Sequence, residues 1–410
     1  MILEVINTGS ELLLGNTVNT HLSFLGQELF PLGLRIARQV TVPDGEDIRT
    51  ALAESLARAD IILVTGGLGP TTDDITREIT ADLFGLPLVE NETVWKSIQD
   101  RFARRGLDMT PRNRRQAQVP QGATVLVNPN GTAPGLYLRH TAEAQGVTRH
   151  LFLLPGPPRE LRPMFQNVVA PILKDLVPGG ATVQARRWLV IGLGESKVES
   201  IVGEKLLAVP GLEVGYCARP GSVEVRCIGA ADALAAAEAI MAAELPTQVA
   251  GEGGAPLEDL IVHRLTTLGK TLATAESCTG GYLAHKITNV PGASEVLIEG
   301  FVTYSNQAKL TALGVPPDLL AEHGAVSAPV ARAMAEGAMR HAGSSFALAT
   351  TGIAGPGGGT PEKPVGTVFI ALAIQGEETR SIKHNYPTDR ATFKDLTVQA
   401  ALDLLRTAIQ

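Results

Sequence analysis

Short apolar runs alternate with amphipathic segments along the first part of the chain. Residues 1–8 form such a run, and a glycine turn separates them from a helical pattern over residues 19–32. A strand-like run over residues 34–42, an amphipathic helix over residues 47–59 and a buried strand over residues 60–65 continue the alternation. This order is typical of a doubly wound α/β domain with a parallel sheet.

The alternation of strands and helices returns near the C-terminus. A helix is predicted over residues 257–268, and Ser327-Ala328-Pro329 is a typical helix start, with a serine cap and a proline in the first turn. Strands are predicted over residues 271–275, 295–304, 346–350, 366–374 and 379–386. The last part of the chain is therefore predicted to be a second α/β domain.

The middle of the chain has a different pattern. Strand-like runs are predicted over residues 182–191, 212–218 and 222–229, with helices over residues 195–207 and 230–244, which indicates a small α+β domain. Glycine-rich segments at residues 178–180 and 251–256 are typical of linkers. We therefore predict three domains, at residues 1–178, 179–250 and 251–410.

Composition narrows the classes of function. A net charge of −7 gives no global basic field for nucleic acid. The three cysteines have no C-x-x-C spacing, so they fit a reducing compartment better than a disulfide or zinc framework. No apolar run reaches the roughly 18 residues that a membrane span needs, and no basic leader precedes the first strand. We expect a cytoplasmic protein without a membrane partner.

The sequence A-E-S-C-T-G-G, residues 275–281, ends the predicted strand over residues 271–275. A strand that enters a helix through a glycine turn brings Ser277 to a helix N-terminus, where free backbone N–H groups can stabilise an oxyanion. Ser277 is thus a candidate nucleophile. The alternative is that Ser277 and Thr279 cap the helix and that Gly280 and Gly281 only permit the turn.

A base for this serine is offered by Lys309, which lies 32 residues later, about one βαβ crossover away. Burial can lower the pKa of a lysine enough to leave a neutral amine. The alternative is a solvated surface charge. Cys278 is a rival nucleophile, since a helix start lowers the pKa of a thiol. The eight histidines show no metal-ligand spacing and none accompanies the serine, so a Ser-His-Asp triad is unsupported.

In the first domain a second glycine turn, T-G-G-L-G-P at residues 65–70, follows the predicted strand over residues 60–65. Ligands of open parallel sheets bind at the carboxyl ends of strands, and such a turn brings N–H groups close to phosphate oxygens. Asp73 and Asp74 follow and could hold a divalent metal. The alternative is that one of them caps the helix that starts near Ile75.

Basic residues gather between positions 101 and 115. Arginines stand at 101, 104, 105, 112, 114 and 115, a local positive patch suited to a diphosphate, although a solvated helix face is an alternative. Near the third buried strand, at residues 151–154, a stiff proline-rich loop places Glu160 at a helix start as a further candidate metal ligand.

Another glycine-rich segment, residues 351–359, follows the predicted strand over residues 346–350. So much glycine indicates either a mobile lid or backbone that approaches a substrate closely. Arg390, just before the closing helix, could bind a substrate phosphate or cap that helix. Both interpretations stay open.

Three ordered motifs resemble the C-terminal domain of the CinA family, a nicotinamide mononucleotide deamidase. They are A-E-S-C-T-G-G, Y-S-N-Q-A-K at residues 304–309 and A-T-T-G-I-A-G-P-G-G-G at residues 349–359. The resemblance implies that Ser277 and Lys309 are the catalytic pair, with Tyr304 in the site and no cofactor. It implies further substrate-binding residues at Thr279, Gly280, Gly281, Asn306, Thr351, Gly352, Gly355 and Arg390.

The N-terminal half resembles the CinA N-terminal domain, which is related to molybdopterin-binding proteins of the MoaB/MogA type. The matching motifs are G-S-E-L-L, T-G-G-L-G-P, N-R-R-Q-A, G-T-A-P-G and L-P-G-P-P-R-E, starting at residues 9, 65, 113, 131 and 154. The resemblance implies an ADP-ribose pyrophosphatase that needs Mg, Mn or Co. Its implied ligand contacts are Gly66, Gly67, Gly69, Asn113 and Arg114, with Asp73, Asp74 and Glu160 on the metal. One departure is Ser10, where many members carry aspartate.

The middle domain resembles the KH-like domain of the same family. A nucleic-acid-binding KH domain uses a basic G-x-x-G loop, whereas the nearest loop here, Gly192-Leu193-Gly194-Glu195, is acidic. We therefore expect a spacer or a dimer contact, no nucleic acid partner, and a homodimer.

Two reactions and one other role are thus open. The leading hypothesis is hydrolysis of nicotinamide mononucleotide to nicotinic acid mononucleotide and ammonia, and the second is metal-assisted cleavage of ADP-ribose. The third is a non-catalytic binding or scaffolding protein linked to competence or DNA damage. A further alternative is that only one of the two sites is active.

Overall fold

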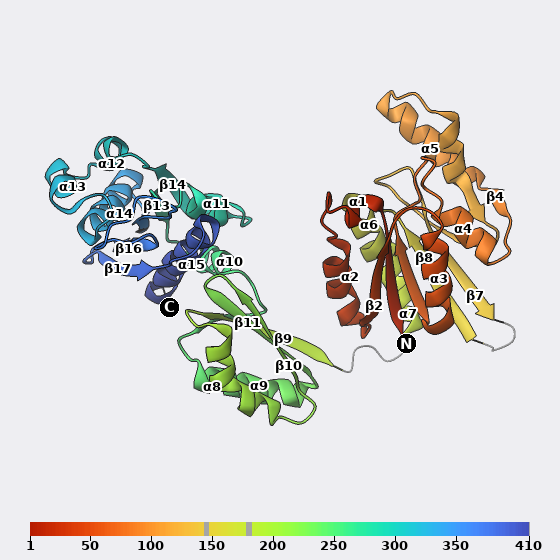
Figure 1. Cartoon of the computed structure of the whole chain (residues 1–410), viewed down its shortest axis with the longest axis horizontal. Helices are drawn as coiled ribbons and strands as arrows, with labels where there is room; N and C mark the ends of the chain where they lie inside the picture. The colour runs from red at the N-terminus through yellow and green to blue at the C-terminus, as the bar shows by residue number, and fades with distance from the viewer. Residues whose placement is uncertain (143–146, 178–182, 410) are drawn as a thin grey trace. The chain divides into compact units, whose positions relative to one another are not determined.

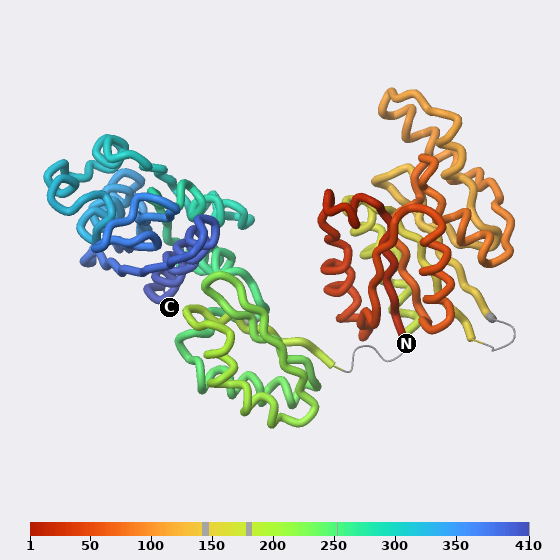
Figure 2. Tube along the Cα trace, viewed as in Figure 1, coloured from red at the N-terminus to blue at the C-terminus, as the bar shows by residue number. Residues whose placement is uncertain are grey.

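The computed structural model describes residues 1–142, 147–177 and 183–409 (Figure 1). Its helices and strands form two units, Met1–Thr182 and Val183–Gln410, which can be followed along the Cα trace in Figure 2. The predicted linker at residues 178–180 lies outside the described residues. None of the helices in the described ranges is long and apolar enough to cross a membrane.

A six-stranded sheet forms the centre of the first unit, in the order β2-β1-β3-β8-β7-β6. Its strands are β1 (Leu3–Thr8), β2 (Ile36–Val42), β3 (Ile61–Thr65), β6 (Thr124–Leu126), β7 (Gly135–Ala142) and β8 (Val147–Leu154). The first three strands and β8 are parallel, but β7 runs antiparallel to β8 and β6 antiparallel to β7. The sheet is therefore mixed, which the predicted alternation of strands and helices did not indicate.

Helices cover both faces of this sheet. The residues of β1 and β3 are therefore buried at every position. Apolar side chains of α3 (Asp47–Arg58) and α4 (Thr76–Leu83) pack on one face. Those of α2 (His21–Leu29), α6 (Pro158–Met164) and α7 (Ala170–Leu176) pack on the other. The result is the three-layer α/β arrangement that the sequence predicts.

A smaller lobe extends from this unit. It contains a two-stranded antiparallel ribbon, the longest helix of the lobe and a short 3₁₀ segment around a small apolar cluster. The elements of the lobe are β4 (Leu88–Glu90), β5 (Gln118–Pro120), α5 (Glu92–Arg105) and η2 (Pro111–Ala117). The short helix α1 (Ser10–Leu13) is not part of the lobe and follows β1. In Figure 1 the lobe projects beyond the sheet at the end of α5.

The second unit begins with a four-stranded antiparallel sheet in the order β10-β11-β9-β12. Its elements are β9 (Gln184–Ile191), β10 (Glu213–Arg219), β11 (Ser222–Gly229), β12 (Val249–Glu252), α8 (Glu195–Leu207) and α9 (Ala231–Glu244). The two helices share one apolar core with the sheet. This is the predicted α+β module, although β12 occupies the start of the predicted linker over residues 251–256. Its likeness to KH domains stays a prediction.

A five-stranded sheet forms the rest of the second unit, in the order β14-β13-β15-β16-β17. Its strands are β13 (Leu272–Glu276), β14 (Leu297–Val302), β15 (Phe346–Gly352), β16 (Thr367–Ile374) and β17 (Arg380–Asn385). The strands β14, β13 and β15 are parallel, and β16 and β17 continue antiparallel. The carboxyl ends of β13 and β14 therefore lie at the same sheet edge.

Helices again cover both faces of this sheet. One face carries α10 (Leu257–Leu268), α11 (Tyr282–Thr288) and α15 (Arg390–Ala408). The other carries α12 (Asn306–Leu313), α13 (Pro317–His323) and α14 (Ala328–Ala342). Ser327 precedes α14 as predicted, but its hydroxyl donates to the Gly324 carbonyl and does not cap the helix.

The α+β module and the five-stranded part share packing within the second unit. Leu189 and Ile191 of β9 belong to the same apolar core as α10 and α15. The loop of residues 192–195 lines a cavity of about 550 Å³ together with side chains of β17 and α15. The acidic loop thus faces a neighbouring helix of its own unit.

Candidate functional site

The turn after β13 is where the sequence predicts a nucleophile. The Ser277 N–H donates to the Thr350 carbonyl of the neighbouring strand at 2.9 Å, which fixes the start of the turn. Gly280 and Gly281 have φ of 62° and 90°, in the left-handed region that favours glycine. Helix α11 begins directly afterwards at Tyr282. The predicted strand–turn–helix arrangement is therefore present.

Neither Ser277 nor Thr279 caps α11, because Glu276 does so. Its fully buried carboxylate accepts from the Leu283 N–H at 3.0 Å and from the Ala284 N–H at 2.8 Å. The Thr279 hydroxyl instead lies 2.7 Å from the Thr350 hydroxyl. The capping alternative for the serine is wrong, and the Ser277 side chain is left available for other contacts.

Lys309 lies beside this serine. Ser305 caps α12, and Lys309 is in the first turns of that helix, with only 1% of its surface exposed. Its Nζ donates to Ser277 Oγ at 3.0 Å, to the Thr303 carbonyl at 2.8 Å and to the Tyr304 carbonyl at 3.5 Å. The surface-charge alternative for Lys309 is wrong.

The surroundings of Lys309 reduce the affinity of its amine for a proton. Burial lowers the pKa of Lys309, and the only opposing influence is the nearby Cys278 thiol. Two of its three contacts are carbonyl oxygens, and neither carries a formal charge. The buried Glu276 carboxylate is occupied by the N–H groups of α11. The site thus pairs a hydroxyl with an amine whose proton affinity is reduced.

Cys278 points into the apolar core and does not compete. Only 5% of its surface is exposed, and burial raises the pKa of its thiol to about 12. A thiol that remains protonated near neutral pH is a poor nucleophile. Next to it, the N–H groups of Thr279 and Gly281 have no hydrogen-bond partner in the described ranges. These two groups are among the free backbone donors beside Ser277.

Three of the other predicted residues meet at the surface of this site. Arg390, the first residue of α15, donates to the Tyr304 hydroxyl at 3.0 Å and to the Gly355 carbonyl at 3.1 Å. Asp389, not Arg390, caps α15, because its carboxylate accepts from Ala391 N–H and Thr392 N–H. Tyr304 remains 61% exposed. The guanidinium thus ties the glycine-rich segment to the residues just before Lys309.

The remaining predicted contacts of this site have other surroundings. Thr351 is buried and its hydroxyl donates to the Ala325 carbonyl at 2.8 Å. Gly352 lies so close to the next strand that an added Cβ would be 2.7 Å from the Thr367 carbonyl oxygen. Asn306 is exposed at the start of α12. Thr351 and Gly352 therefore position the end of β15, and Asn306 faces solvent.

The first unit has its own cavity, of about 520 Å³, at the carboxyl ends of β1 and β3. The predicted Gly66, Gly67 and Gly69 line it, together with Asp73, Asp74 and Glu160. Gly66 and Gly67 have φ of 103° and 67°, and an added Cβ would be 2.5 Å from Thr8 Oγ1 or 2.0 Å from Thr76 Oγ1. Glycine is therefore required where the loop approaches β1 and α4.

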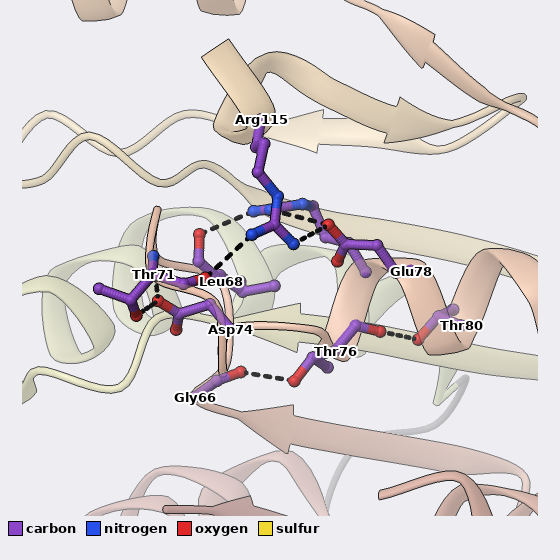
Figure 3. Close-up of polar contacts among 9 residues, drawn as sticks. Gly66, Leu68, Thr71, Asp74, Thr76, Glu78, Thr80 and Arg115 are labelled. Carbon is purple, nitrogen blue, oxygen red and sulfur yellow. Dashed lines mark hydrogen bonds and ion pairs between the residues drawn. The ribbon is translucent and has the colours of Figure 1, made fainter. Parts of the chain in front are cut away.

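The glycine loop is held from above and below, as Figure 3 shows. Thr76 donates to the Gly66 carbonyl at 3.2 Å, and the fully buried Arg77 donates to the Leu68 carbonyl at 2.7 Å. Arg115 donates to the Thr71 carbonyl at 3.1 Å and pairs with Glu78 at 2.9 Å. These contacts give the loop one defined conformation over the cavity.

The acidic side chains of this cavity do not form a ready-made metal cage. Asp74 accepts from the Thr71 N–H and hydroxyl, so it does not cap α4, and Glu160 accepts from Asn128 at 2.9 Å. Within residues 1–142, 147–177 and 183–409, no three His, Cys, Asp or Glu side chains are grouped closely enough to hold a metal. An ion at this place would need further ligands besides these side chains.

Asn113 and Arg114 lie away from the cavity lining. The buried Asn113 amide oxygen accepts from the Thr110 N–H and hydroxyl at 2.8 and 2.9 Å. Arg114 forms a bidentate pair with Glu90 at 2.8 and 3.1 Å. Asn113 therefore stabilises η2, and Arg114 links that segment to β4.

Other residues line the cavity that sequence reasoning did not select. Gln116 donates to the Thr132 hydroxyl at 3.0 Å, and both line the cavity. Both residues belong to motifs that the sequence analysis identified, N-R-R-Q-A and G-T-A-P-G, so these motifs could have pointed to them. Asp44 also lines it and accepts from the Ser10 N–H at 3.0 Å. His21, whose pKa is lowered by burial, had no local sequence signal.

Two known protein families match this chain, and each match covers most of one unit. The family of the CinA C-terminal domain matches residues 254–409, and the family described as a "Probable molybdopterin binding domain" matches residues 4–175. The fold and the two sites thus define a protein that joins a domain of the molybdopterin-binding type to a CinA C-terminal domain.

Full-length relatives identify the family. A CinA-like protein of Akkermansia muciniphila is 48% identical over 97% of this chain and 95% of its own length. A CinA-like protein of Gemmatimonas aurantiaca is 38% identical over 100% of this chain and 96% of its own. The chain belongs to the CinA family.

Solved structures resemble parts of the chain. The competence/damage inducible protein CihA of Agrobacterium tumefaciens is 43% identical and covers 37% of this chain and 93% of its own, with a TM-score of 0.37. A molybdenum cofactor biosynthesis protein of Corynebacterium diphtheriae is 16% identical and covers 43% of this chain and 97% of its own, with a TM-score of 0.29.

Proposed function

We propose that the second unit hydrolyses nicotinamide mononucleotide to nicotinic acid mononucleotide and ammonia. The observation that carries this proposal is the 3.0 Å contact between Lys309 Nζ and Ser277 Oγ at a buried helix start. A hydroxyl becomes nucleophilic when a base in hydrogen-bond reach takes its proton. Burial that lowers the pKa of Lys309 supports its role as that base.

In the first half-reaction Ser277 Oγ attacks the carboxamide carbon, and its proton moves to the neutral Lys309 Nζ. The oxyanion would accept from the free N–H groups of Thr279 and Gly281. Collapse of the tetrahedral adduct breaks the C–N bond, and Lys309 gives its proton to the departing nitrogen. Ammonia leaves, and the acyl group remains as an ester on Ser277.

In the second half-reaction water attacks the ester carbon and Lys309 takes a proton from it. Collapse then breaks the ester C–O bond, and the proton returns to Ser277 Oγ. The carboxylate product and the original pair result. Arg390 and Tyr304, joined at 3.0 Å at the surface of the site, are suited to contact the substrate's phosphate.

The test is ammonia release from nicotinamide mononucleotide by the full chain. Ser277→Ala should lower turnover by at least about a thousandfold, since loss of a nucleophile removes the covalent route. Cys278→Ala serves as the control because that thiol is buried and protonated, and it should keep most of the activity. The reverse order of the two variants would refute the assignment of the nucleophile.

For the first unit we propose cleavage of the pyrophosphate bond of ADP-ribose. The supporting observation is the cavity of about 520 Å³, which combines the glycine loop of residues 66–69 with carboxylates at its rim. A divalent ion (Mg, Mn or Co) bound there would polarise the phosphates and neutralise their charge. Asp73, Asp74 and Glu160 would hold it together with the substrate's own oxygens.

The residues of this chain would contribute binding and orientation in that second reaction. The N–H groups of the glycine loop would approach the phosphates, and Gln116 and Thr132 would contact the rest of the ligand. Release of AMP and ribose 5-phosphate from ADP-ribose by the full chain, measured by chromatography, tests it. Gly67→Ala should abolish the release, because its Cβ would be 2.0 Å from Thr76 Oγ1.

We also propose that the chain works in the cytoplasm. Its three cysteines, Cys217, Cys227 and Cys278, are all free thiols in the structure. Free thiols without a disulfide framework fit a reducing compartment.

A further inference from the structure

A second, strongly basic pocket of about 490 Å³ lies in the first unit. Four of its six lining residues are arginines, and they come from two separate segments of the chain. The lining residues are Arg101, Arg104, Arg105, Pro129, Asn130 and Arg159. Neither of the two proposed reactions uses this pocket.

Hydrogen bonds hold the two arginine-bearing segments together. Arg101, in the last turns of α5, donates from Nη1 to the Pro129 carbonyl at 2.6 Å and from Nη2 to the Asn130 carbonyl. Asn130 in turn donates from Nδ2 to the Arg159 carbonyl at 3.3 Å. The loop at residues 129–130 therefore fixes the end of α5 against the start of α6. The pocket between them is a built feature of the fold.

The arginines in this pocket repel one another with little compensation. Burial lowers the pKa of Arg101, and the charges of Arg105, Arg104 and Arg159 lower it further. Glu160 alone acts in the opposite direction, and its carboxylate is also hydrogen-bonded by Asn128. Arg104 and Arg105 pair with no carboxylate in the part of the chain that the structure describes. The pocket therefore carries an excess of positive charge that a bound anion would neutralise.

The dipole of α5 accounts for only part of the cluster. Cations in the last turn of a helix interact favourably with its C-terminal dipole, which explains Arg104 and Arg105 on their own. Arg159, in contrast, is in the first turn of α6, where the helix dipole makes a cation unfavourable. The helix dipole therefore does not account for Arg159 opposite the end of α5.

We propose that this pocket binds a multiply charged phosphate group, the diphosphate or triphosphate part of a small ligand. Guanidinium groups bind phosphate oxygens with paired, charge-assisted hydrogen bonds, and four of them line the pocket. The pocket adjoins the 520 Å³ cavity, because Arg159 of one and Glu160 of the other are 3.8 Å apart. The site is a distinct anion site, and its existence does not depend on either proposed activity.

The experiment measures binding of tripolyphosphate to the full chain by isothermal titration calorimetry at physiological ionic strength. The variant Arg104→Ala/Arg105→Ala removes two pocket charges but leaves the anchoring hydrogen bonds of Arg101 intact. Each lost arginine should raise the Kd by about tenfold. The control is Arg112→Ala, an exposed arginine on η2 outside the pocket, which should bind like the wild type.

Any of three outcomes would overturn the proposal. The first is that Arg112→Ala weakens binding as much per lost charge as the pocket variant does. The second is that the pocket variant binds tripolyphosphate as tightly as the wild type. Either result would mean that only general surface charge is involved. If a mixed-sequence single-stranded oligonucleotide binds more tightly than tripolyphosphate and the pocket variant loses that binding, the arginines form a nucleic-acid surface. Circular dichroism of each variant distinguishes lost binding from lost folding.

Discussion

Among single residues, Lys309 has the most demanding role. A base must accept a proton, and a guanidinium stays protonated at all ordinary pH values. Lys309→Arg should therefore lower ammonia release nearly as much as Lys309→Ala, by about a hundred- to ten-thousandfold. Steady-state kinetics with nicotinamide mononucleotide measure this. Substantial turnover in Lys309→Arg would mean that residue 309 only supplies positive charge.

The pH dependence of the reaction follows from the same residue. Burial lowers the pKa of Lys309, and the neutral amine is the active form. Turnover should thus rise with pH as the amine loses its proton, and should level off below the pKa of about 10.4 of a solvated lysine. A pH profile of kcat measures the midpoint. A rate that still climbs through pH values near that of free lysine would contradict a buried base.

Single residues also show how far short motifs predict which side chains lie close together. Ser277, Lys309 and Tyr304 belong to two short motifs, and the structure brings them together with Arg390. Asn113 was also selected from a motif, yet it stabilises a local turn. A motif indicates that a residue contributes either to the fold or to the site. The contacts of that residue in the structure then show which of the two it serves.

Among helices and strands, the contact between α14 and the end of α12 positions Lys309. Gly337 of α14 faces this contact, and an added Cβ would be 2.1 Å from the Leu313 carbonyl oxygen. Gly337→Ala should therefore lower the free energy of unfolding by about 1–3 kcal/mol, despite the better helix propensity of alanine. Urea unfolding of the full chain measures the change, and ammonia release should fall with it.

Gly26 provides the matched control for this substitution. It lies within α2 of the first unit, and an added Cβ would meet no atom within 4 Å. Gly26→Ala should raise the free energy of unfolding by about 0.5–1 kcal/mol, because alanine restricts the unfolded chain and favours a helix. A stabilising Gly337→Ala would show that α12 and α14 are not tightly packed.

The elements differ in how far the sequence predicts them. Helices α8 and α10 have the predicted bounds, since each has a regular apolar face and clear ends. Helix α12 was missed because its eight residues have little apolar periodicity, although Ser305 is a good cap. The antiparallel pairing of β7 with β8 joins two consecutive strands only four residues apart, but the sequence analysis did not identify β7 as a strand.

For the whole molecule, two units with two different sites predict separable chemistry. Cleavage of ADP-ribose is proposed to need a divalent ion, whereas amide hydrolysis by Ser277 and Lys309 is proposed to need none. A chelator should therefore abolish ADP-ribose cleavage by the full chain and leave ammonia release unchanged. Parallel assays with and without chelator measure both. Equal sensitivity of the two activities would contradict two independent sites.

The central claim for the molecule is that Ser277 carries the acyl group during amide hydrolysis. The most direct measurement is rapid quenching of the full chain with nicotinamide mononucleotide, followed by peptide mass spectrometry. We predict an ester of the nicotinic acid mononucleotide acyl group on Ser277, and none in the Ser277→Ala chain. An acyl group on Cys278, or unimpaired ammonia release by Ser277→Ala, would contradict the claim.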